Sequence, residues 1–164
     1  MRTLTRVSAT VAALLSLATA AQSQSANITA TAVVYQAMTV TGARALDFGN
    51  VFPGVAKSIA VAAATSGRFD LTGQASANVN LTFTLPTNLT SGANNLPIGT
   101  WTGCTNATNT TTGCTTFTPS GTATPTAFSG TGNLFVWVGG TVTPAANQAA
   151  GTYNGTVTLT AAYF

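Results

Sequence analysis

The chain has 164 residues, of which 4% are charged and none is histidine. Two of its five cations lie in a segment that we expect to be removed, which leaves three cations against two carboxylates, a net charge of +1. This charge is too small to neutralise a run of phosphates, so we expect no nucleic-acid partner. With Asp47 and Asp70 as the only carboxylate side chains, the sequence predicts no enzyme and no metal or cofactor site.

The N-terminus has the order of a secretory signal peptide: two arginines, an apolar run over residues 7–21 and then small polar residues. Cleavage after Ala20 and cleavage after Ser23 both fit, so residues 1–23 are the expected leader. The competing interpretation is a membrane anchor, but an apolar run of about 15 residues falls short of the roughly 20 that a spanning helix needs. No later apolar run is long enough, so we expect no anchor in the mature protein.

The mature chain shows alternation of period two, separated by Gly, Pro and Asn, which is typical of an all-β sandwich. The first extended segment covers residues 26–40, and its apolar side chains fall mostly on even positions. Further strands are expected around residues 59–63 and 69–71, and most clearly over residues 79–85, where Pro86 ends the run. Residues 134–138 are continuously apolar, as in a strand that is buried on both faces.

Residues 89–128 are rich in Thr, Gly, Asn and Pro, and we expect long surface loops there with one strand pair near Trp101 and Phe117. Cys104 and Cys114 are the two cysteines of an exported chain, so we expect them to form a disulfide. The last predicted strand covers residues 151–164, with apolar residues or Gly on odd positions and mostly Thr on even ones. The alternation continues to the last residue, Phe164, which suggests an edge left for another chain.

Few residues offer chemistry. Asp47 lies in the tetrapeptide Leu46-Asp47-Phe48-Gly49, where an aspartate more often bonds the backbone of a turn. We expect a structural role for Asp70 as well. Trp101, flanked by glycines, is the one candidate for an exposed platform that could stack on a sugar, so a monomeric secreted binding module, possibly for carbohydrate, remains the alternative function.

The C-terminal run, with Tyr163 as penultimate aromatic and Gly151 fourteen positions from the end, resembles the C-terminal signature of bacterial chaperone-usher pilins. The Leu-Asp-Phe-Gly motif, a Gly-Gly pair before Thr141 and the pattern Ala-Gly-Thr-Tyr-Asn-Gly-Thr from Ala150 also resemble a secreted bacterial family of unassigned function, similar to the archaic pilin and spore-coat-U branch.

The pilin resemblance implies an immunoglobulin-like β-sandwich that lacks its last strand, over residues 41–164, preceded by a donor segment over residues 24–40. It implies a structural subunit of a surface pilus or fimbria-like fibre, exported through the periplasm. Its partners would be copies of itself or sister pilins, a periplasmic chaperone and an outer-membrane usher. The donor side chains would be Ile28, Ala30, Ala32, Val34 and Met38. The acceptor edge and chaperone contact would comprise Gly151, Val157, Leu159, Ala161, Tyr163 and Phe164.

Overall fold

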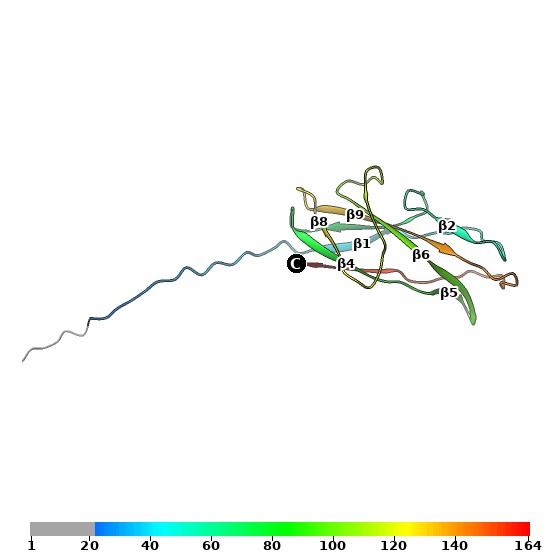
Figure 1. Cartoon of the computed structure of the whole chain (residues 1–164), viewed down its shortest axis with the longest axis horizontal. Helices are drawn as coiled ribbons and strands as arrows, with labels where there is room; N and C mark the ends of the chain where they lie inside the picture. The colour runs from blue at the N-terminus through cyan, green and yellow to red at the C-terminus, as the bar shows by residue number, and fades with distance from the viewer. Residues whose placement is uncertain (1–21) are drawn as a thin grey trace, which may run out of the picture. The chain divides into compact units, whose positions relative to one another are not determined.

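The computed structural model describes residues 22–164, and the expected leader lies almost wholly outside this range. The chain divides after Val33 into two units. In the first, residues 22–33 contain no strand or helix and every side chain is exposed. The second, residues 34–164, is built from strands in two antiparallel sheets (Figure 1), so the predicted all-β sandwich is confirmed.

The larger sheet has the strand order β1-β3-β9-β6-β5, with β2 also pairing β9 and β7 also pairing β6. The smaller sheet has the order β10-β4-β8. The strands of the larger sheet are β1 (Thr39–Arg44), β2 (Lys57–Ile59), β3 (Gly67–Thr72), β5 (Asn88–Ser91), β6 (Asn94–Asn106), β7 (Thr115–Phe117) and β9 (Asn133–Val142). Those of the smaller sheet are β4 (Asn78–Thr84), β8 (Thr124–Ala127) and β10 (Thr158–Tyr163).

The core forms between the sheets because the strands alternate in side-chain character. In β4, Val79, Leu81 and Phe83 are buried, whereas the Asn and Thr residues between them are more exposed. They join Leu71, Ala77, Phe128, Leu134, Val136, Val138 and Leu159 in one buried cluster, the main cluster. A second cluster is made by Phe48, Leu96, Ile98 and Val142. The sandwich therefore has a divided core.

Strand β9 is buried on both faces, as its continuous apolar run predicts. Val136 and Val138 belong to the main cluster, whereas Phe135 and Trp137 alternate with them and so point to the other face of the sheet. Trp137 is nevertheless only 3% exposed. The loop that carries the disulfide and the turn before Ser66 both border this outer face, where they line a small cavity together with Trp137.

The sequence did not predict the longest strand. We expected loops over most of residues 89–128, but β6 runs for 13 residues through that segment and pairs with β5, β7 and β9. The apolar residues Leu96 and Ile98 alternate as expected of a strand. Pro97 between them and Gly99 after them are residues that usually mark a turn, so they hide the alternation. The expected strand pair near Trp101 and Phe117 is present as β6 with β7.

Two strands are shorter than expected. Strand β2 ends at Ile59, and turns follow it where we expected the strand to continue to residue 63. The closing strand β10 begins only at Thr158. Residues 151–157 pair with the rest of the domain through a single bridge, between Asn154 and Thr90.

The predicted disulfide between Cys104 and Cys114 is present, and Cys104 is fully buried. Replacing both cysteines by alanine should lower the free energy of unfolding by about 2 to 3 kcal/mol, because the bond restricts the unfolded chain. Urea unfolding of the full chain and of the double variant, both without reductant, measures the difference. Reductant should lower the stability of the parent alone, and an unchanged midpoint would contradict the prediction.

Candidate functional site

Residues 34–164 contain a groove with a volume of about 1140 Å³. One rim is formed by residues 42–53, which leave β1 and pass through the Leu46-Asp47-Phe48-Gly49 motif. The other rim is formed by residues 148–157, the segment that precedes β10. We call this cavity the groove and these two segments its rims. Between the rims, the lining side chains are Phe69, Leu89, Leu96, Ile98, Val138 and Pro144.

The groove lies where the two core clusters come to the surface. Val138 belongs to the main cluster, and Phe69 and Val157 pack against it. Leu96 and Ile98 belong to the second cluster. All five line the groove, so core side chains form part of its wall, beside polar residues of the two rims such as Asn50 and Thr152. A strand placed in the groove would bury apolar surface from both clusters at once.

The rims have backbone groups available for pairing. Within residues 149–157, the backbone hydrogen bonds in the described part of the chain are two. The Thr90 N–H donates to the Asn154 carbonyl at 2.8 Å, and the Asn154 N–H donates to the Thr90 carbonyl at 2.9 Å. In the other rim the Asp47 N–H donates to the Thr65 carbonyl. Beyond Arg44, where β1 ends, neither rim forms a strand along the groove. The charged residues that line the groove are Arg44 and Asp47, and Pro53 and Pro144 line it as well. Charge, which usually protects an open sheet edge, is thus scarce here.

The Leu-Asp-Phe-Gly motif is a structural turn at the first rim. A carboxylate oxygen of Asp47 accepts the N–H of Gly49 at 2.7 Å, and Gly49 has a φ of 56°, which favours glycine. This agrees with the expected role of Asp47. The Lys57 ammonium donates to the Asn50 carbonyl at 2.9 Å, which anchors the turn against β2. The turn thereby places Phe48 in the second cluster.

The second rim is held by Tyr153. Its hydroxyl donates to the Ala149 carbonyl and accepts from the Gln148 amide, both at 2.7 Å. Gln148 also donates to the Asn95 carbonyl at 3.0 Å, which ties the rim to β6. The rim is therefore fixed by side chains, with little backbone pairing of its own.

Of the six predicted acceptor residues, the structure places two in the groove. Gly151 and Val157 line it, whereas Leu159 is buried in the main cluster and Ala161 packs half-buried against that cluster. Phe164 is exposed. The groove is therefore centred on the segment before β10. Sequence reasoning did not identify the first rim, although the family motif within it was a usable signal.

The predicted donor residues do not share one environment. Ile28, Ala30, Ala32 and Val34 are exposed, and Ile28 and Val34 are 96% and 90% exposed. Met38 is half-buried and packs against the main cluster, so its own domain already uses this side chain. Strand β1 begins one residue later, at Thr39.

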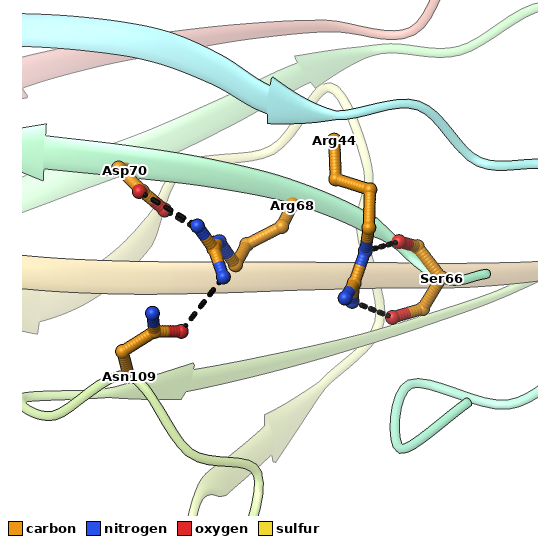
Figure 2. Close-up of polar contacts among 5 residues, drawn as sticks. All are labelled: Arg44, Ser66, Arg68, Asp70 and Asn109. Atoms are coloured by element: carbon orange, nitrogen blue, oxygen red, sulfur yellow. Dashed lines mark hydrogen bonds and ion pairs between the residues drawn. The ribbon is translucent and has the colours of Figure 1, made fainter. Parts of the chain in front are cut away.

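A row of polar contacts lies over the outer face of the larger sheet (Figure 2). Arg68 pairs through two nitrogens with Asp70, at 2.8 and 3.0 Å, and donates at 2.8 Å to Asn109 in the disulfide loop. Arg44 donates to the carbonyl and the hydroxyl of Ser66 at 2.6 and 2.8 Å. Asp70 therefore has the structural role expected of it. The row ties the disulfide loop and the turn before β3 to the sheet.

Trp101 is packed rather than freely presented. It lies in the irregular part of β6, where the register to β9 shifts between Gly99 and Thr102, and it is half-buried against both core clusters. The Trp101 ring packs closely on the backbone of Gly140. A Cβ at Gly140 would lie only 3.2 Å from the indole, so glycine leaves room for the ring. Stacking on a sugar would need more of this ring to be exposed.

Within residues 22–164, no group of three or more potential metal ligands occurs, and no helix is long and apolar enough to cross a membrane. No curated protein matches this chain. The family model described as "Domain of unknown function (DUF4402)" matches residues 38–163, from the residue before β1 to the end of β10. Because the match covers most of the chain and nearly all of the sandwich, the protein belongs to the DUF4402 family.

Proposed function

We propose that the protein is a structural subunit of a surface fibre that assembles by donor-strand complementation. In this proposal, residues 24–34 of one copy enter the groove of the next copy and complete an immunoglobulin-like sandwich. The observation that carries the proposal is the groove itself: an open cavity of about 1140 Å³ walled in part by core side chains, in a chain that also has an exposed alternating segment. This is β-strand addition, in which backbone bonds give affinity and alternate side chains give register.

The dimensions and chemistry of donor and groove agree. Residues 24–34 in extended form would span about 36 Å, which is long enough to reach along the residues between the two rims. The donor carries no charged residue, and its even positions place Ile28, Ala30, Ala32 and Val34 on one face. An apolar face of this kind matches the Leu, Ile, Val and Phe side chains that line the groove between its more polar rims.

Exposed apolar side chains around the groove support the same proposal. Phe52 lines the groove and is 69% exposed, and Val55, three residues later, is also exposed. Such side chains are commonly covered in an assembly. Before assembly, a periplasmic chaperone would cover the groove, and an outer-membrane usher would exchange it for the next donor. Head-to-tail insertion does not close on itself, so the product is a filament.

Deleting residues 24–34 should abolish filaments while leaving the sandwich folded, because the deleted residues lie outside the folded unit except for Val34 at its border. Electron microscopy and resistance to SDS would report filaments, and circular dichroism would report the fold. A synthetic peptide of residues 24–34 should bind the deleted variant, and a peptide with the same residues in scrambled order is its control.

Filaments formed by the deleted variant would overturn the donor assignment. The alternative function, a monomeric binding module, would be favoured by two results together: the full-length chain stays monomeric at high concentration, and it binds a small-molecule ligand in the groove.

A further inference from the structure

The hydroxyl of Tyr163 connects the two ends of the sandwich domain. It accepts the backbone N–H of Gln74 at 2.7 Å and donates to the backbone carbonyl of Gln36 at 2.9 Å. The N–H of Gln36 in turn donates to the side-chain oxygen of Gln74 at 3.3 Å. Both backbone groups of Gln36 are thereby held. We call this set of contacts the clamp.

Aromatic packing reinforces the clamp. The Tyr35 ring meets the Tyr163 ring edge-on, with centroids 5.2 Å apart, and Phe128 packs on Tyr163 with centroids 6.0 Å apart. A side chain at Gly73 would overlap the Tyr163 hydroxyl and the Phe128 ring, so glycine is required for the close approach. The clamp is therefore built by four separate segments, and it holds the residues that immediately precede β1.

The groove lies at the other end of β1. Gly42 and Arg44 line it and Tyr163 does not, so the first rim starts in the second half of β1 and continues away from the clamp. For residues 24–34 to fill the groove of their own domain, the chain would have to reverse direction just before β1 and run antiparallel to it. The tightest reversals favour residues such as Asn-Gly at their centre. Residues 22–41 contain no glycine and no proline.

We infer that the clamp acts as a positioning device that makes donor insertion intermolecular, by preventing the chain from folding back into its own groove. The inference rests on the proposed function, and Tyr163 is its central positioning residue. Two barriers act together: residues 34–38 contain none of the residues that favour a tight turn, and the clamp holds both backbone polar groups of Gln36.

The test removes the barriers one at a time in the full chain, refolded at low concentration as a monomer. Four proteins are compared: the parent, Tyr163→Phe, the turn variant Gln36→Asn with Ala37→Gly, and the combination of all three substitutions. The turn variant keeps the clamp, because the contacts at position 36 are made by backbone atoms. Ser58→Ala, which removes a hydroxyl contact of 2.7 Å to Thr141 at a distant site, is the matched control for losing a hydroxyl.

Hydrogen exchange of residues 24–33 in the monomer is the measurement. We expect rapid exchange in the parent, in Tyr163→Phe, in the turn variant and in Ser58→Ala. We expect about 100-fold slower exchange in the combined variant, independent of protein concentration. Protection in the parent monomer, protection in the turn variant with Tyr163 intact, or no protection in the combined variant would each overturn the inference.

Filament assays on the same proteins separate this inference from the proposed function. Suppose that the parent forms no filaments, while residues 24–33 of the combined variant are protected from exchange. This result would overturn the proposed fibre assembly and leave the inference about the clamp supported. A combined variant that still forms filaments as readily as the parent would overturn the clamp and leave the assembly supported.

Discussion

Gly139→Ala should lower the free energy of unfolding by about 3 kcal/mol, at the upper end of what overpacking a core costs. A Cβ at this position would overlap the carbonyl oxygen of Ile59 and lie 2.7 Å from the Thr102 hydroxyl. The carbonyl belongs to the backbone of β2, which cannot rotate away as a side chain can. Relief would require β2 to separate from β9, with which it pairs at the neighbouring Gly140.

Gly99→Ala is the control for Gly139→Ala. Gly99 also lies in a strand that pairs with β9, but a Cβ there would meet no atom within 4 Å. Alanine should be neutral or stabilise by about 0.5 kcal/mol, because it reduces the freedom of the unfolded chain. Thermal unfolding of the monomeric full chain should show a midpoint about 10 °C lower for Gly139→Ala. Equal midpoints for the two variants would mean that β2 does not lie as close to β9 as described.

The part of the fold that the sequence predicts is the part with uninterrupted alternation. In β4, Val79, Leu81 and Phe83 follow one another at period two with no glycine or proline between them, and the structure has the strand there. In β6, Pro97 and Gly99 interrupt the same period, and a register shift at Trp101 changes which face each later residue occupies. Local pattern cannot reveal such a strand, because its pairing with β9 overrides its weak local preference.

The groove was harder to predict than the strands. Its rims are irregular segments, fixed by the Asp47 turn on one side and by Tyr153 on the other. Neither contact is encoded by a periodic pattern, and both depend on residues brought together by the finished sandwich. The alternation of the last strand placed the expected acceptor over residues 151–164, whereas the structure extends the groove back to Gln148 and shares it with the first rim. The role of the Tyr163 hydroxyl in holding Gln36 could not be predicted either, because the two residues are 127 positions apart.

Ile28→Asp should weaken the binding of the donor to the groove about a thousandfold and abolish filaments. Ile28 is the largest side chain on the even face of the donor and is 96% exposed in the free segment. Burying an isoleucine contributes about 2 kcal/mol, and placing a carboxylate among apolar side chains costs about as much again, for a total of about 4 kcal/mol. Every 1.4 kcal/mol is about tenfold in affinity.

Thr29→Asp introduces the same charge one residue away. It tests whether the even or the odd side chains of the donor enter the groove. If the even side chains enter the groove, position 29 faces solvent, so this variant should bind within about fivefold of the parent peptide. Titration of donor peptides carrying either substitution into the variant that lacks residues 24–34 gives both affinities directly. Equal weakening by the two substitutions would show that residues 24–34 do not enter the groove as a strand. If Thr29→Asp weakens binding more than Ile28→Asp does, the odd side chains, including Val33, enter the groove, and the donor register is shifted by one residue.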